Sequence, residues 1–329
     1  MAVDGRVEAH QGTALESSGG FGYPCSFMRE LRLLFWYLLF VFMGGAMLAP
    51  WVWKAAQACA HAWPAVERLA RQPFHRYVNR CLLVLALAGL WPLFRAFALG
   101  GRTDHGWRGP WRRPILLGAM GGLASCLAIL VAALVVGDTS LAKGVSPGWL
   151  AGRIASALGT GALVALMEEW LFRGMIHGAL RRSLSFPRVA AITSALYALV
   201  HFFDRPPQPE VVGAFTGLWT LGRMMHGLTD VSALMPGLLN LFAVGWMLAL
   251  ARERTGSLAL SMGIHGGWVL GIKLLGSLMD RNPGATPLMW GTAKVFDGWA
   301  ASVVLAIPWL ALHVATRQPP TPARRHARE

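Results

Sequence analysis

Long apolar runs separated by short polar connections dominate the pattern along this chain. Runs of about 20 apolar residues have the length that a helix needs to cross a bilayer. They are rich in Gly, Leu and Ala and do not alternate between polar and apolar positions, as the strands of a membrane barrel would. The pattern predicts an all-α polytopic membrane protein with about eight transmembrane helices. The expected spans are about 32–53, 78–99, 114–136, 150–180, 186–203, 232–251, 257–279 and 296–315.

The segments around these spans complete the expected organisation. Residues 204–231 hold an apolar stretch too brief to cross the bilayer, which predicts a short interfacial or re-entrant helix. No internal repeat is evident. The expected divisions are a polar N-terminal segment (1–31), three first transmembrane helices (32–136), a core (150–280), a last transmembrane helix (281–316) and a disordered basic tail (317–329).

Composition and charge narrow the class of protein. Of 329 residues, 55% are hydrophobic and 14% are charged, and the formal net charge is +14. The basic residues gather in short connections and at the tail, as in cytoplasmic loops, and no aromatic and basic surface motif accompanies them. We therefore expect the lipid bilayer as a partner and no nucleic acid.

The distribution of arginine among the loops predicts the orientation in the membrane. The loops after the second, fourth and sixth spans are arginine-rich, which places both termini in the cytoplasm. The loop after the first span is an exception, because it carries Lys54, Arg68, Arg71 and Arg76. The composition is bacterial in style, so the expected location is the inner (cell) membrane of a bacterium.

Five of the ionisable residues within the expected spans are the candidate site. They are Glu168, Glu169, Arg173, His201 and His265. Burying such a group costs several kcal/mol unless it is paired, so it is a functional candidate by default. Glu168, His201 and His265 lie 14, 14 and 13 residues from the flanking arginine or proline at the cytoplasmic ends of their spans. At about 1.5 Å per residue, all three are roughly 20 Å deep.

The two glutamates differ in their expected partners. Glu169 and Arg173 are four residues apart and share a helix face, so the arginine can neutralise this glutamate. Glu168 is rotated by about 100° and is left to meet His201 and His265. The alternative interpretation is a buried ion pair that only fixes helix packing.

A carboxylate with two imidazoles suits the hydrolysis of a peptide bond near the membrane. One group can deprotonate water and another can stabilise the developing oxyanion. The same groups could also hold zinc as a His₂Glu site, but the HExxH spacing of helical zinc proteases is absent. The four cysteines have no metal-ligand spacing. We therefore expect no metal and no other cofactor, with zinc as the alternative.

Other polar residues have simpler interpretations. His177 is expected at the membrane interface, and the alternative is that it lines an entrance to the site. Lys273 is expected to extend toward the outer interface or to face a cavity.

Three short motifs resemble those of the CAAX protease and bacteriocin-processing family, also called the CPBP or Abi family of intramembrane endopeptidases. EEWLFRG at 168–174 resembles the EExxxR motif, YALVH at 197–201 is similar to FxxxH, and IHGGWV at 264–269 looks like a third motif in which asparagine or aspartate often follows the histidine by four residues. Order and spacing agree, and the resemblance covers about residues 150–280.

The resemblance implies an eight-helix endopeptidase of the glutamic type, with its catalytic site inside the helix bundle and a membrane-associated peptide or protein as substrate. If the motif residues have the same roles as in that family, Glu168 with His201 would activate the water, and His265 would help to stabilise the oxyanion. Glu169 and Arg173 would support the structure and electrostatics of the site.

Two positions depart from the family's motifs. Tyr197 stands in place of phenylalanine and adds a hydroxyl that needs a partner. Val269 stands in place of the third-motif asparagine, so one oxyanion donor is missing. A backbone N–H or another side chain, such as Asn240, would have to substitute for it. Otherwise this chain catalyses differently or is inactive.

Two further classes of function compete with a protease. One is a non-catalytic bacteriocin-immunity or membrane scaffold protein of the same fold, which Val269 favours. The other is a proton-coupled transporter, which the lack of an inverted repeat disfavours.

Overall fold

A computed structural model describes residues 25–60, 62–97, 105–228, 231–282, 284, 286–290 and 298–315. The regular secondary structure of this part of the chain is helical apart from one two-stranded antiparallel sheet, in which Thr139 lies opposite Arg281. The elements are α1 (Cys25–Leu39), the π-helix η1 (Phe40–Gly44), α2 (Gly45–Ala60), α3 (Pro64–Ala70), α4 (Phe74–Ala96), α5 (Arg112–Val136), β1 (Thr139–Leu141), α6 (Pro147–Glu169), the π-helix η2 (Trp170–Ile176), α7 (His177–Leu180), α8 (Phe186–Val200), α9 (Thr216–Met225), the 3₁₀-helix η3 (His226–Leu228), α10 (Val231–Thr255), α11 (Ala259–Leu275), β2 (Met279–Arg281), α12 (Pro287–Trp290) and α13 (Trp299–Ala315).

The helices confirm an all-α polytopic membrane protein. Two shorter apolar helices, α8 and α11, accompany the long ones. The number of eight transmembrane helices stays a prediction. Within the described residues, five helical stretches are long and apolar enough to cross a membrane: Met28–Ala60, Phe74–Ala96, Arg112–Val136, Pro147–Leu180 and Leu234–Thr255.

Two predicted segments fall mostly or wholly outside the described residues. These are residues 1–24 of the polar N-terminal segment 1–31, and the basic tail 317–329. The short helix expected within 204–231 is present as α9, which packs against α2 and α4.

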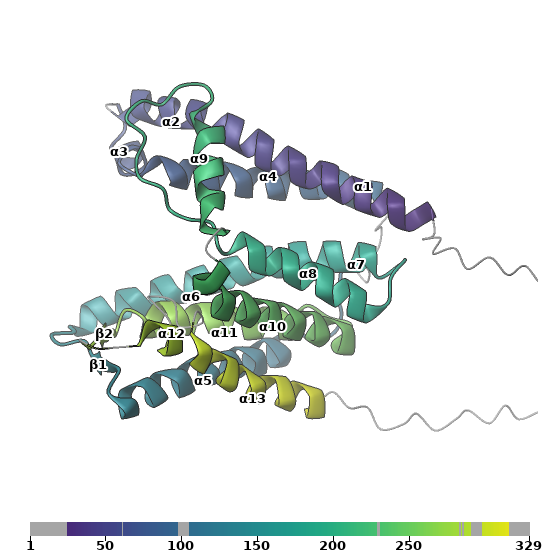
Figure 1. Cartoon of the computed structure of the whole chain (residues 1–329), viewed down its shortest axis with the longest axis vertical. Helices are drawn as coiled ribbons and strands as arrows, with labels where there is room; N and C mark the ends of the chain where they lie inside the picture. Colours follow the sequence, from purple (N-terminus) through teal and green to yellow (C-terminus); the bar gives the residue numbers. More distant parts are fainter. Residues whose placement is uncertain are drawn as a thin grey trace, which may run out of the picture.

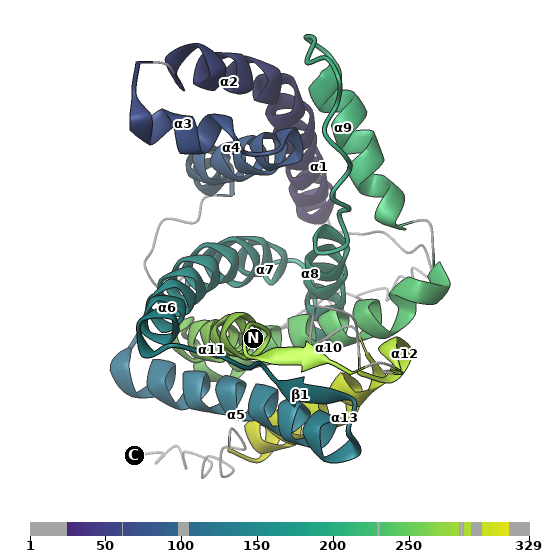
Figure 2. The same ribbon diagram turned by 90° about the vertical axis from the view of Figure 1, so that its left-hand side faces the viewer.

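The helices form two groups (Figure 1). One group holds α1 to α4 and α9. The other holds α5, α6, α10, α11 and α13, with α7 and α8 between the two groups. The strongest packing runs between α11 and its neighbours α5 and α6, and between α8 and α10. Figure 2 shows α11 enclosed between α6 and α5. The core of the second group is therefore built around α11.

Glycines bring α5 and α11 into backbone contact. A Cβ added to Gly122 on α5 would lie 2.4 Å from the carbonyl oxygen of Ile264, and one added to Gly263 on α11 would lie 2.3 Å from that of Ile115. Small residues at such contacts let membrane helices approach closely, since lipid provides no hydrophobic drive between them. The outer face of α5 instead carries large apolar side chains, including Met120 and Val135. We call this glycine contact the α5–α11 seam.

Local signals explain where α6, the helix with the acidic pair, begins. Ser146 precedes the helix, and its hydroxyl accepts a hydrogen bond from the backbone N–H of Trp149 at 3.3 Å. Pro147 occupies the first turn, where its missing N–H is not needed. The helix then runs to Glu169, where η2 takes over.

Candidate active site

A buried ion pair lies where α6 passes into η2. Glu169 ends α6, Arg173 lies in η2, and neither side chain has any exposed surface. Arg173 Nη1 donates to Glu169 Oε1 at 2.8 Å, and Nη2 donates to the carbonyl of Gly245 on α10 at 3.1 Å. The arginine neutralises this glutamate, in agreement with their spacing, and joins its helix to α10.

His265 on α11 also bonds this glutamate. Its Nδ1 lies 2.9 Å from Glu169 Oε1. An ionised carboxylate can only accept, so Nδ1 carries the proton of this bond. The other ring nitrogen, Nε2, lies 3.7 Å from Oε2 of Glu168. The bond to Glu169 was not predicted, because one sequence does not reveal how α11 is rotated about its axis.

His201 approaches Glu168 from the end of α8. Its Nδ1 lies 2.7 Å from the carbonyl oxygen of Tyr197, which can only accept, so this nitrogen also carries a proton. Its Nε2 lies 3.8 Å from Glu168 Oε2. Both imidazoles therefore turn Nε2 toward the same carboxylate oxygen. The two distances exceed those of direct hydrogen bonds.

The ring of Tyr197 fills the space between these groups. The guanidinium of Arg173 lies over it at 4.6 Å from the ring centroid. The centroids of His201 and His265 lie 4.5 and 6.0 Å away, and that of Phe172 lies 5.5 Å away. Tyr197 is 3% exposed. Contacts on several sides therefore fix its orientation.

The structure thus brings all five predicted site residues into one cluster. Three helical stretches carry them: α6 with η2, the end of α8, and α11. Residues 147–271 match the family model described as type II CAAX prenyl endopeptidase Rce1-like, and all five residues fall in that range. Residues 147–271 form a CAAX protease domain. No curated protein and no solved structure matches the chain.

The match to a peptidase family indicates where the protein resides and what kind of molecule it acts on. The protein is an integral membrane protein, because the CAAX protease domain and its neighbours supply apolar spanning helices. It is related to membrane endopeptidases, and a peptidase acts on a peptide or protein.

A cavity of about 210 Å³ opens beside the two histidines. Tyr197, His201, His265 and Val269 line it, together with apolar side chains from α5, α10 and α13. Since α5 and α13 lie outside residues 147–271, the cavity is completed by helices outside the CAAX protease domain.

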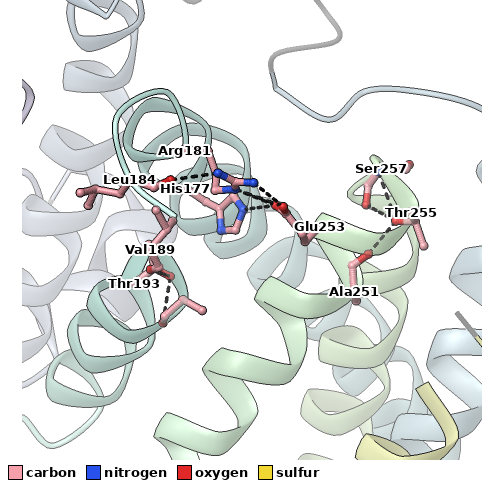
Figure 3. A network of polar contacts seen from close by, with 10 residues as sticks. His177, Arg181, Leu184, Val189, Thr193, Ala251, Glu253, Thr255 and Ser257 are labelled. Carbon is pink, nitrogen blue, oxygen red and sulfur yellow. Dashed lines mark hydrogen bonds and ion pairs between the residues drawn. The ribbon is translucent and has the colours of Figure 1, made fainter. Parts of the chain in front are cut away.

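His177 is buried inside the protein, and its expected position at the membrane interface stays a prediction. The residue is 2% exposed, and its Nε2 lies 3.3 Å from Glu253 Oε2 on α10. Arg181 donates to the same carboxylate, with Nη2 at 2.7 Å from Oε1 (Figure 3). Glu253 was not singled out from the sequence, because it lies between two arginines at the end of a span and resembles part of a charged loop.

Asn240 and Lys273 have partners near the cavity. The Asn240 amide donates to the carbonyl of Gly298 at 2.9 Å and accepts from the hydroxyl of Ser302 at 2.7 Å. It therefore bonds α10 to the start of α13, which argues against Asn240 as a substitute for the motif asparagine. Lys273 lines the cavity and donates to the Thr160 hydroxyl at 2.8 Å.

A zinc ion at this site would need Glu168, His201 and His265 as its ligands. Across the described ranges, no group of three or more His, Cys, Asp or Glu side chains is arranged to hold a metal ion. Glu168 Oε2 lies 3.8 Å from Nε2 of His201 and 3.7 Å from Nε2 of His265.

Proposed function

We propose that the CAAX protease domain hydrolyses a peptide bond in a membrane-associated protein or peptide, using a water molecule that Glu168 and His201 activate. The observation that carries the proposal is the position of Glu168 Oε2, 3.8 and 3.7 Å from the Nε2 atoms of His201 and His265. Each ring uses its Nδ1 proton elsewhere, so a neutral ring presents a lone pair at Nε2.

Three hydrogen-bond acceptors therefore face one point. A water molecule there can donate both of its protons and keep its oxygen lone pairs for attack on a carbonyl carbon. Glu168 then acts as the general base, and proton transfer of this kind typically contributes about 10²–10⁴ in rate.

Glu169 and Arg173 act in this proposal by positioning His265. The carboxylate of Glu169 holds the Nδ1 proton, which fixes the ring's orientation and tautomer. If Nε2 also takes up a proton during the reaction, the resulting imidazolium can donate to the oxyanion. Glu169, itself neutralised by Arg173, stabilises that charge.

Terminal-peptide mapping tests the proposal on all the membrane proteins of a cell at once. Membrane fractions of cells that express the wild type are compared with those that express Glu168→Gln, His201→Ala or His265→Ala. We expect new protein termini only with the wild type, while the purified variants keep their melting temperature. Turnover by the Glu168→Gln variant would refute the proposal.

Glu253→Gln is the matched control. The side chains of Glu253 and Glu168 are both 28% exposed, and each lies beside a histidine in the same domain. Glu253 pairs with His177 and Arg181, whereas Glu168 lies beside His201 and His265. We expect this variant to cleave as the wild type does, so a loss specific to Glu168 cannot come from removing a half-buried carboxylate in general.

A second assay addresses the substrate class that the family's description names. An internally quenched peptide ending in farnesyl-cysteine and three further residues is offered to the protein in lipid nanodiscs, beside the same peptide without the farnesyl group. Faster cleavage of the farnesylated peptide assigns prenylated chain ends as substrates. Equal cleavage rates for the two peptides would indicate that the substrates are membrane-associated peptides in general.

We propose that the reaction needs no metal. Carboxylate and imidazole acceptors around one water suffice to remove its proton. We expect cleavage to continue after treatment with a chelator. Stoichiometric zinc in the purified protein, lost together with activity in the His201→Ala variant, would replace this mechanism with that of a metalloprotease.

Val269 favours a second candidate function, a non-catalytic immunity or scaffold protein of the same fold. The residue lines the cavity beside His265 and offers no hydrogen-bond donor. Such a protein would bind or protect equally well with Glu168→Gln, which is nearly isosteric. The same variant therefore separates the two functions.

A further inference from the structure

We propose that the hydroxyl of Tyr197 donates the hydrogen bond that stabilises the oxyanion of the tetrahedral intermediate. This inference rests on the proposed function, since an oxyanion forms only if the site hydrolyses a peptide bond. Such a site needs at least one donor aimed at the carbonyl oxygen, because negative charge develops there in a water-poor environment.

Most polar groups around the cavity have other partners. Trp268 Nε1 donates to the Ser125 hydroxyl at 2.8 Å, and Ser125 in turn donates to the carbonyl of Gly122 at 2.7 Å. The Nδ1 protons of His201 and His265 are bonded as described above. In their neutral forms, these two rings have no N–H left for a substrate.

The Tyr197 hydroxyl differs from these groups. It has no hydrogen-bond partner among the described residues, although the aromatic ring is almost completely buried. Unpaired hydroxyls such as those of Ser194 and Thr220 are sealed inside the protein, whereas the Tyr197 oxygen is not. Tyr197 is one of the residues that line the cavity of about 210 Å³.

The surroundings of the ring hold this donor in place. Arg173 lies over the ring, and His201, His265 and Phe172 contact it from other sides. A donor whose position is fixed before the reaction stabilises developing charge without a cost of reorganisation.

Both departures from the family's motifs line the same cavity. Val269 follows His265 by one helical turn and has lost a donor amide, while Tyr197 has gained a donor hydroxyl. One position therefore adds the kind of group that the other lacks, which explains how the site could work with valine at 269.

Glu168 takes one proton from water, and the water oxygen forms a bond to the carbonyl carbon. The C=O π electrons move to the carbonyl oxygen, where the Tyr197 O–H donates a hydrogen bond and keeps its proton. When the electrons return, the C–N bond breaks and its electron pair goes to nitrogen, which receives the proton from Glu168. The products are a carboxylic acid and an amine.

The test measures the initial rate at which new protein termini appear in isolated membranes, with the cell's own membrane proteins as the probe. Tyr197→Phe keeps the ring and removes only the hydroxyl. We expect it to cut the rate about 10²–10³-fold at an unchanged melting temperature. We expect the double variant Tyr197→Phe with Val269→Asn to recover at least tenfold, since it returns an amide donor to the cavity.

The matched control is Tyr37→Phe, another buried tyrosine. Its hydroxyl donates to the carbonyl of Ala86 at 2.9 Å, away from the cavity. We expect this control to keep the wild-type rate.

Two results overturn parts of the argument separately. If Tyr197→Phe keeps the wild-type rate while Glu168→Gln is inactive, the oxyanion role is wrong and the proposed function stands. The same holds if the rate of Tyr197→Phe falls only in step with the melting temperature of that variant. If the wild type produces no more termini than Glu168→Gln, the proposed function fails and the role of Tyr197 fails with it.

Discussion

Two glutamate and arginine pairs in this chain have the same spacing and order but opposite surroundings. Glu169 precedes Arg173 by four residues with both side chains fully buried, and Glu67 precedes Arg71 by four residues with 50% and 76% of their side-chain surface exposed. Removing each arginine therefore compares one ion pair inside the protein with one outside it.

The structure sets the expected magnitudes. Arg173→Ala removes the hydrogen bonds to Glu169 Oε1 and to the carbonyl of Gly245, and it leaves a buried carboxylate without its guanidinium partner. Breaking a buried pair by removing one partner costs about 3–5 kcal/mol. An exposed pair contributes about 0–1 kcal/mol, so Arg71→Ala should cost less than about 1 kcal/mol.

Thermal unfolding of the detergent-solubilised protein, followed by tryptophan fluorescence, measures the difference. At about 2–4 °C per kcal/mol for a chain of this order of size, Arg173→Ala should lower the melting temperature by on the order of 10 °C. Arg71→Ala should change it by no more than about 4 °C. The double variant Glu169→Gln with Arg173→Met should recover much of the loss, because it leaves no unpaired buried charge.

Equal shifts for Arg173→Ala and Arg71→Ala would refute the reasoning, since burial would then not decide the strength of the pair. A double variant as unstable as Arg173→Ala alone would show that lost packing of the arginine, and not the unpaired carboxylate, causes the instability.

Three further outcomes are expected. Gly122→Ala should destabilise the protein by about 1–3 kcal/mol, because its Cβ would lie 2.4 Å from the carbonyl oxygen of Ile264. The Cβ of Gly121→Ala on the same helix meets nothing within 4 Å, so this control should be neutral or slightly stabilising. Thermal unfolding compares the two variants. Gly217→Ala should loosen the contact between α9 and α2, since its Cβ would approach the carbonyl of Ala46. Gly222→Ala should leave that contact intact, because its Cβ meets nothing within 4 Å. Limited proteolysis within 204–231 should therefore be faster for Gly217→Ala than for Gly222→Ala. Glu253→Ala should destabilise the protein more than Glu253→Gln, because the amide still offers an oxygen to Arg181, and equal melting temperatures would contradict this.

Much of the helical arrangement was predictable from residue patterns. Apolar runs of membrane-crossing length place the long helices, since each must satisfy its own backbone hydrogen bonds in lipid. The spacing of Glu169 and Arg173 predicts their pairing, and counting depth along three spans predicts that Glu168, His201 and His265 lie at one level. In the structure these three side chains meet. Their catalytic roles stay a prediction.

What was not predictable depends on helix rotation and on contacts between distant segments. The bond from His265 to Glu169 requires a particular rotation of α11, and a nearly uniform apolar helix carries no clear amphipathic face that would reveal it. The contact of His177 with Glu253 was not predictable, because the two residues are 76 positions apart in the sequence. The packing of α5 along α11 was not predictable either, because glycines are frequent in the apolar runs and only those at a contact matter.

The α5–α11 seam has a consequence for how variation in this protein should be interpreted. The seam sets the distance between two helix axes, and α11 carries His265 one residue from Ile264, whose backbone touches Gly122. A single methyl group on α5 would therefore displace an imidazole that it never contacts, and with it the bond to Glu169. Relatives that carry a larger residue at this place should differ in turnover before they differ in substrate preference. A screen for inactive mutants should accordingly recover substitutions in α5, outside the family domain and away from every ionisable side chain of the site.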